Sequence, residues 1–211
     1  MVQLRGYIFL NSLQPQLASY TAATTRGYLP IAGEASLWIE VDPGMAINRV
    51  TDIAQKSNAV KPGLQVIERA FGVLEIHAPA QDVVMDAGDQ ILRHLGLKET
   101  DRQAPKVMTS EIITNIDPYQ SMLINRMRKG NLLLEGQTLY ILEVYPAIYT
   151  VFAANEAEKA SPISLIDVQP IGAFGRLYLG GTESAIAEAA KAAEGSLQTV
   201  KGVAGKIPGS L

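Results

Sequence analysis

Hydrophobic and polar positions along this chain follow two periods, one typical of strands and one typical of helices. Residues 37–41 form a short, mostly apolar run, which predicts a buried strand. Ile47, Val50 and Ile53 come next at spacings of three, which predicts a helix with one apolar face. Pro43 is expected at the first position of that helix, because proline lacks only an N–H that would be unpaired there anyway.

The remaining elements are predicted by the same two periods. Further strands are expected at residues 4–10, 64–67, 73–76, 107–113, 139–144, 163–168 and 176–179, and further helices at residues 14–25, 81–95, 118–128, 146–160 and 182–193. Strands and helices mixed in this order predict an α/β fold, a two-layer α+β sandwich of the ferredoxin-like type. Beyond Gly195 the chain is rich in Gly, Ser and Lys, and we expect a mobile tail there.

The chain also repeats itself at a constant offset. Pro43 and Pro146 both follow an apolar run and lie 103 positions apart (146 minus 43). A gapless match at one offset predicts two tandem copies of one domain, residues 1–101 and residues 102–211, each of typical domain size. The same offset relates Pro15 to Pro118, Gly27 to Gly130, Leu29 to Leu132, Gly33 to Gly136, Glu40 to Glu143, Lys56 to Lys159 and Ala70–Gly72 to Ala173–Gly175.

Composition narrows the class of protein. The chain is 47% hydrophobic and only 18% charged. Soluble domains are usually about 25% charged, so we expect much of the surface to be buried, in a core and against further copies. The net charge of −3 gives no basic footprint, so nucleic acid is not an expected partner. No apolar run reaches the roughly 20 residues that span a bilayer, and the start lacks a signal peptide, so we expect a soluble, intracellular protein without a membrane partner.

Residues suited to catalysis or metal binding are scarce. There is no cysteine, and the only histidines are His77 and His94. His77 ends a predicted strand and is expected to be structural. Asp82, Asp86 and Asp89 fall at helical spacing, for which a solvated helix face is favoured over a metal site. We therefore expect neither an enzyme nor a metal or cofactor site.

The charged pair at the end of one predicted strand stands out. Glu68 and Arg69 are adjacent and lie just before the Phe-Gly that opens the next strand. The second copy has Ile171 and Gly172 at the corresponding positions, followed by Ala173, and carries no such pair. On the residues alone, Glu68 and Arg69 are interpreted as a solvated ion pair at a strand end.

Three features in a fixed order resemble the bacterial microcompartment shell domain. In each copy a Glu-Val strand, Glu40–Val41 or Glu143–Val144, precedes a helix that carries a lysine near its end, Lys56 or Lys159, and a glycine-containing loop follows. Each copy also begins one strand and one helix earlier than the ordinary domain, which resembles its circularly permuted version. With the Pro-Gly-x-Gln-x-x-Glu-Arg run at residues 62–69, the chain resembles the tandem permuted shell proteins of the carboxysome.

The resemblance implies a role for the charged pair. Glu68 and Arg69 match a gating pair whose side chains swing to open or shut a wide central pore. The second pore loop, at Ile171, Gly172 and Ala173, departs from the Glu-Arg pattern. We therefore expect only the first copy to supply the gate.

The resemblance also implies an assembly. Three chains are expected to close into a homotrimer, a pseudohexamer, which can stack as a dimer of trimers and tile with other carboxysome shell proteins. Lys56 and Lys159 match a lysine of the lateral edge contact. The expected location is the carboxysome shell, and the expected cargo is ribulose bisphosphate and 3-phosphoglycerate, the latter also as an anionic ligand.

A function of another class stays open on the residues alone. A tandem α/β sensor would bind a small molecule between its copies and signal through a change of assembly. The mass in solution separates the two, because a trimer or hexamer favours the shell protein and a dimer favours the sensor.

Overall fold

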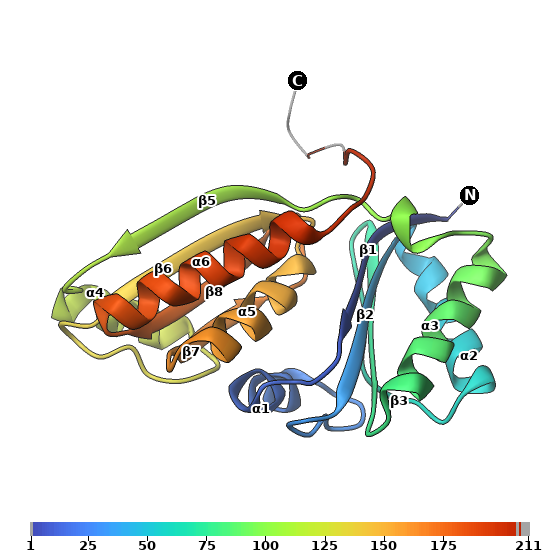
Figure 1. Ribbon diagram of the computed structural model, residues 1–211, viewed down its shortest axis with the longest axis horizontal. Helices are drawn as coiled ribbons and strands as arrows, with labels where there is room; N and C mark the ends of the chain where they lie inside the picture. Colours follow the sequence, from blue (N-terminus) through green and yellow to red (C-terminus); the bar gives the residue numbers. More distant parts are fainter. Residues whose placement is uncertain (1, 206, 208–211) are drawn as a thin grey trace. The chain divides into compact units, whose positions relative to one another are not determined.

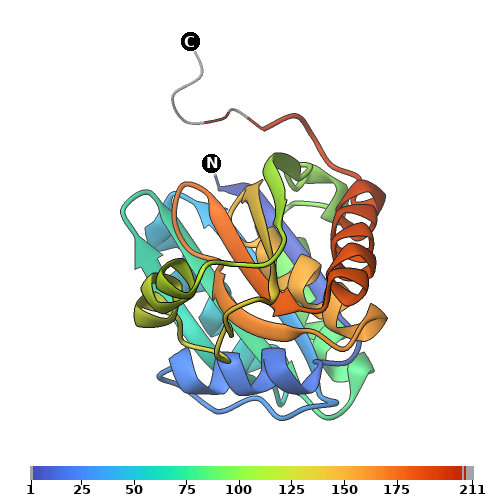
Figure 2. The same ribbon diagram turned by 90° about the vertical axis from the view of Figure 1, so that its left-hand side faces the viewer.

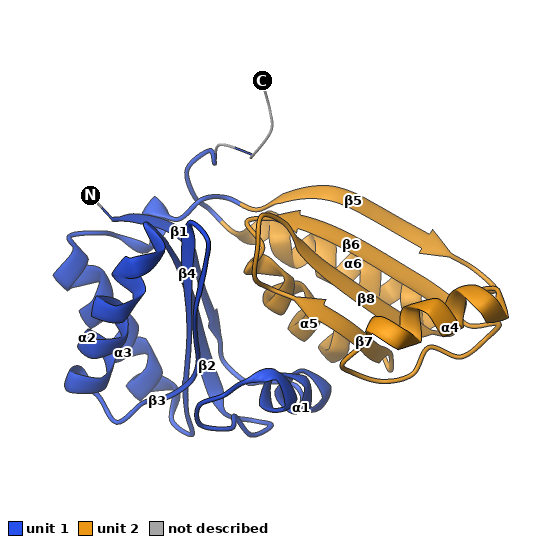
Figure 3. Ribbon diagram, turned by 180° about the vertical axis from the view of Figure 1, so that it is seen from behind, with its two compact units in different colours: residues 1–104, 201–211 blue, residues 105–200 orange. Residues whose placement is uncertain are grey.

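A computed structural model of the 211-residue chain describes residues 2–205 and 207. It divides into two compact units (Figure 3). Unit 1 contains residues 1–104 together with the chain from Lys201, and unit 2 contains Pro105–Val200. The segment from Lys201 thus groups with the first compact unit, and the domain bounds of residues 1–101 and 102–211 stay a prediction.

Unit 1 is built on an antiparallel sheet with the strand order β1-β2-β4-β3. Helices α2 and α3 cover one face, and α1 lies by the other (Figure 1). The core lies between the sheet and α2 and α3, where Leu37 and Leu74 of the central strands pack with Val50 and Ile91. The elements are β1 Gln3–Leu10, α1 Pro15–Thr24, β2 Ala35–Asp42, α2 Ile47–Ser57, β3 Lys61–Glu68, β4 Phe71–Ala78 and α3 Gln81–Leu95.

Unit 2 repeats this plan with the strand order β5-β6-β8-β7. Helices α5 and α6 lie behind its sheet in Figure 3, and α4 lies in front. The register also repeats, because Tyr7 faces Ile39 in unit 1 and Ser110 faces Leu142 in unit 2. Two tandem α/β domains are therefore confirmed. The elements are β5 Lys106–Ile113, α4 Pro118–Met127, β6 Thr138–Tyr145, α5 Tyr149–Ala160, β7 Ser164–Gln169, β8 Gly175–Gly181 and α6 Glu183–Thr199.

The helix that follows each Glu-Val strand begins later than predicted. Helix α2 begins at Ile47 and α5 at Tyr149. Pro43 has an extended backbone (φ −70°, ψ 151°) and precedes a short 3₁₀ turn, so it cannot be the first residue of the helix. The peptide bonds before Pro43 and Pro146 are both cis.

The end of the chain differs from the expected mobile tail. Helix α6 continues to Thr199, because Leu197 extends its buried face. The segment that follows, red in Figure 2, pairs with the linker: the Ala104 N–H donates to the Val203 carbonyl (2.9 Å), and Arg102 Nε donates to the Lys201 carbonyl (3.0 Å). The tail prediction is therefore wrong up to residue 205, and residues 206 and 208–211 lie outside the described residues.

Candidate functional site

The charged pair lies at the tip of the β3–β4 hairpin. In the register of that hairpin Glu68 faces Phe71, so only Arg69 and Ala70 form the turn. Arg69 has φ 51°, in the left-handed region that residues other than glycine seldom adopt. A tight turn of this kind holds the backbone of residues 68–70, which we call the pore loop after the role predicted for it, while leaving its side chains outside the sheet.

The pair itself is loose and open to solvent. Arg69 Nε lies 3.7 Å from Glu68 Oε1, and the side chains are 93% and 46% exposed, respectively. Exposed ion pairs contribute only about 0–1 kcal/mol, because water and salt screen them and ordering two long side chains costs entropy. The Arg69 side chain can therefore leave Glu68 and return to it at little cost.

The backbone of the pore loop rests on the turn after β2. The Gly44 N–H donates to the Ala70 carbonyl at 2.6 Å. A Cβ on Gly44 would lie 2.8 Å from the Phe71 carbonyl carbon and oxygen, which is closer than real Cβ contacts. Glycine is therefore required where the two turns meet. Sequence analysis missed this residue, although its counterpart at the constant offset, Ala147, was a signal that the two loops differ.

The second loop is wider and uncharged. Strand β7 ends at Gln169 and β8 begins at Gly175, so residues 170–174 form the connection. Ile171 and Gly172 are half-buried and Ala173 is exposed. Gly172 has φ 127°, which favours glycine. An acid and a base are therefore presented at one hairpin tip and not at the other.

The two matched lysines lie in the last turns of α2 and α5. Lys56 Nζ is 2.8 Å from Asp52, one turn earlier, and its side chain is 75% exposed. Lys159 Nζ is 2.7 Å from Glu156, and its side chain is 32% exposed. The two lysines thus occupy equivalent positions in the fold but differ in exposure. Lys56 is the more exposed of the two and can more easily reach a neighbouring molecule.

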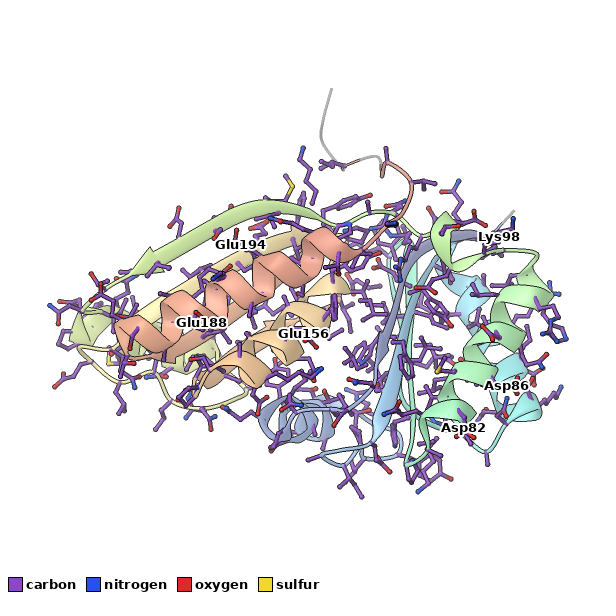
Figure 4. All side chains as sticks on the ribbon, viewed as in Figure 1. Asp82, Asp86, Lys98, Glu156, Glu188 and Glu194 are labelled. Carbon is purple, nitrogen blue, oxygen red and sulfur yellow. The ribbon has the colours of Figure 1, made fainter. Side chains whose placement is uncertain are left out.

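The remaining candidates have structural settings. Asp82 and Asp86 lie exposed along the outer side of α3 (Figure 4). Among residues 2–205 and 207, no three His, Cys, Asp or Glu side chains gather as metal ligands would. His77 is fully buried with Nδ1 3.1 Å from Glu75 Oε2. Within the same described part of the chain, no helix is long and apolar enough to cross a bilayer.

Comparison with known proteins decides the family. Residues 4–101 match the model of the CsoS1D N-terminal domain. The carboxysome shell protein CcmP of Synechococcus elongatus is 51% identical over 95% of this chain and 94% of its own length. The carboxysome shell protein CsoS1D of Hydrogenovibrio crunogenus is 50% identical over 94% of this chain and 97% of its own. The chain belongs to the CcmP and CsoS1D family of carboxysome shell proteins.

Two solved structures extend the likeness to the backbone. A fused permuted hexameric shell protein from the RMM microcompartment is 43% identical, with a TM-score of 0.93 over 95% of this chain and 99% of that one. A double-ringed trimeric shell protein from the same microcompartment is 40% identical, with a TM-score of 0.94 over 97% of this chain and 100% of that one. The tandem permuted shell fold of the CcmP and CsoS1D family is therefore established, while the roles of Glu68, Arg69, Lys56 and Lys159 stay predictions.

Proposed function

We propose that this chain is a non-enzymatic component of the carboxysome shell that closes into a trimer with the pore loop at its centre. The observation that carries the proposal is the exposed Arg69 at a tight hairpin tip, present in one copy of the repeat only. A trimer would therefore gather three Glu68–Arg69 pairs around its axis, alternating with three uncharged loops. Relatives named carboxysome shell proteins, and a neighbour described as trimeric, support this reading.

The different exposure of the two first strands supports closure by further copies. Strand β1 of unit 1 is largely buried, whereas β5 of unit 2 is largely exposed. Several exposed apolar side chains on one pair of elements are what an interaction site would present. We assign it to the next chain of the ring, because a head-to-tail contact that closes on itself gives a ring. The exposed apolar residues of β5 and α4 are Val107, Met108, Ile112, Met122, Leu123 and Met127.

A second set of apolar residues is exposed in both copies. Tyr28, Leu29 and Ile31 are 60–65% exposed in unit 1, and Leu132 and Leu134 are 53% and 56% exposed in unit 2. A contact used by both copies would appear six times on one face of a trimer. We propose these residues as the stacking surface of two trimers, in keeping with the double-ringed relative.

Gating follows from the charges at the axis. Two unit charges about 4 Å apart interact by roughly 4 kcal/mol at an effective dielectric constant near 20, so three arginines brought together repel one another. Glu68 offsets this repulsion when the arginines point inward, and solvent or a neighbouring glutamate does so when they point outward. Two arrangements of similar free energy are what a switchable pore requires.

The proposed cargo is anionic. The net charge of −3 offers no general attraction for phosphorylated metabolites, so any attraction would be local to the Arg69 side chains. We propose that ribulose bisphosphate and 3-phosphoglycerate pass through the opened pore. Lys56 and Lys159 are proposed to lie at the lateral edge, in contact with neighbouring shell proteins.

A cryo-electron microscopy map of the assembled protein tests the proposal, together with its mass in solution. We expect a mass of three or six chains, with Arg69 at the centre. Glu68→Ala with Arg69→Ala is expected to leave a permanently wide pore. Addition of 3-phosphoglycerate, with sodium sulfate at equal ionic strength as a control, is expected to change the fraction of open pores. A dimeric mass would favour the sensor, and Arg69 at the periphery would overturn the gate.

A further inference from the structure

One buried side chain connects the first strand to the pore loop. In the pairing of β1 with β2, Leu4 faces Val41 and Gly6 faces Glu40, so Arg5 is the extra residue of a β-bulge. A bulge redirects a side chain that a regular strand would place elsewhere. Arg5 Nε donates to Glu40 Oε1 at 2.9 Å, and the two side chains are only 4% and 1% exposed.

The other side of the same guanidinium faces the hairpin. Arg5 Cζ lies 3.4 Å from the centre of the Phe71 ring. Phe71 is the first residue of β4 and faces Glu68, at the base of the pore loop. Cation–π contacts are strongest where water is excluded, as it is around this buried arginine. Arg5 therefore connects strands β1 and β2 to Phe71, the residue that directly follows the pore loop.

The second copy has the same bulge without this connection. The pairing of β5 with β6 is irregular between Val107 and Thr109, so Met108 takes the place of Arg5 and is 38% exposed. Glu143, the counterpart of Glu40, lies 3.6 Å from Arg176, whose side chain is 49% exposed. Phe174, the counterpart of Phe71, contacts the Tyr145 ring at 6.1 Å between centroids.

We propose that Arg5 is a positioning residue of the pore loop, acting through its contact with Phe71 while Glu40 fixes its own orientation. The proposal rests on the proposed function of that loop and adds a residue far from it in sequence. A planar guanidinium can donate to a carboxylate in its plane and stack on a ring with its face, whereas an ammonium is a compact charge without a planar face to stack. The contact thus fixes the base of the hairpin and leaves the Glu68 and Arg69 side chains free to swing.

Two substitutions separate this contact from the buried ion pair. Arg5→Lys keeps a positive charge beside Glu40 but removes the planar face. Phe71→Leu keeps the ion pair intact and removes the ring. Both variants avoid leaving Glu40 as an unpaired buried charge, which would destabilise the whole unit. Phe174→Leu in the second copy is the matched control, because that ring contacts Tyr145, whereas Phe71 lies under Arg5.

Hydrogen exchange of the trimer, followed by mass spectrometry, measures the effect. We expect both variants to speed exchange of peptides covering residues 66–72 by about tenfold, with peptides from α2 and α3 unchanged. The double variant should exchange only slightly faster than either single variant, because both substitutions remove the same Arg5–Phe71 contact. Phe174→Leu should leave residues 66–72 unchanged. Unchanged exchange at the hairpin, or an equal rise throughout unit 1, would overturn the proposal.

The proposed gate at Glu68 and Arg69 and the proposed positioning role of Arg5 can be refuted independently. A map of the unaltered assembly with Arg69 away from the centre overturns the gate, whatever exchange shows. With Arg69 at the centre, Arg5→Lys should also broaden the distribution of loop positions among imaged particles. A distribution identical to that of the unaltered protein would refute the positioning role of Arg5 without contradicting the proposed gate.

Discussion

The two units have the same strand order and register but differ in the residues on one face of the sheet. Three polar residues on neighbouring strands of unit 1, Ser36, Glu75 and His77, are fully buried. At the constant offset the second copy has Leu139, Tyr178 and Gly180. The strand order and register are nevertheless the same in both units. The frame is therefore set by the apolar positions that face the paired helices, and the opposite face is free to diverge.

The polar face of unit 1 is organised around one carboxylate. Ser36 Oγ donates to Glu75 Oε1 at 2.6 Å, and the Gly63 N–H donates to Glu75 Oε2 at 3.1 Å. His77 Nδ1 completes the set at 3.1 Å from Oε2. A Cβ on Gly63 would lie 2.3 Å from Glu75 Oε2, so this glycine leaves room for the carboxylate. The carboxylate fixes β3, the strand that leads to the pore loop.

The largest expected effect is loss of this carboxylate. Glu75→Leu leaves the Ser36 hydroxyl, the Gly63 N–H and the His77 ring without their buried acceptor, and we expect a loss of about 3–5 kcal/mol of unfolding free energy. The single tryptophan, Trp38, faces Glu75 across β2 and β4, so its fluorescence reports unfolding of unit 1. Urea titrations are compared at one protein concentration, because assembly stabilises the folded state.

Tyr178→Leu is the matched control in the second copy. Tyr178 is half-buried and packs against the apolar cluster of Ile116, Leu133, Leu139 and Ile166, so we expect a loss of only about 1 kcal/mol. Circular dichroism follows this variant, because the tryptophan lies in the other unit. If Glu75→Leu cost no more than Tyr178→Leu, the buried polar face would not be what distinguishes the copies.

A smaller effect is expected where the two turns of unit 1 meet. Gly44→Ala introduces the residue that the second copy has at position 147, and its Cβ would press on the backbone of Phe71. Overpacking of this kind costs about 1–3 kcal/mol, and here relief requires movement of the pore loop. Hydrogen exchange at residues 67–71 should rise more than elsewhere in unit 1.

The reverse change, Ala147→Gly, removes a methyl group without creating a clash. Its expected cost is about 0.5–1 kcal/mol, from backbone flexibility. Exchange at residues 170–174 should stay close to its original value. If Gly44→Ala left residues 67–71 as protected as before, the turn after β2 would not be a support for the pore loop.

Much of the fold could be predicted from the sequence, because it depends on local periodicity. Helix α3 was predicted at the bounds it has, Gln81–Leu95, since its apolar face is regular and Gly96 (φ 68°) ends it. The start of α2 was wrong, because the extended backbone of Pro43 is not visible in the spacing of apolar residues. The prediction of a mobile tail was wrong up to residue 205, because Val203 pairs with the linker, a contact between residues far apart in sequence.

The candidate site could be predicted only in part, because some of it depends on contacts between residues far apart in sequence. Glu68 and Arg69 are adjacent in the chain, so the pair was visible as a motif. Arg5 and Gly44 act on the loop through a bulge and through a contact between turns, and neither follows from residue spacing. The constant offset was the available signal, because both positions hold a different residue type in the second copy, at Met108 and Ala147.

The smallest effect on stability is expected at the lysines, where the two copies agree. Lys56→Ala removes an exposed pair with Asp52 and should cost less than about 0.5 kcal/mol. Lys159→Ala removes the less exposed pair with Glu156 and should cost slightly more. Assembly into sheets, seen by negative-stain electron microscopy, should nevertheless weaken in both variants and most in the double variant, while the mass of the trimer stays the same.

Lys191→Ala is the control for a general loss of positive charge, because this exposed lysine lies on α6 and not at the end of α2 or α5. Equal weakening of sheets by all three single substitutions would point to net charge and not to a lateral contact. If the Lys56 and Lys159 double variant still formed normal sheets, the proposed lateral contact of both lysines would be refuted. A loss confined to one lysine would place the lateral contact on one copy, and the repeat would then be as unequal at its edge as it is at its pore loop.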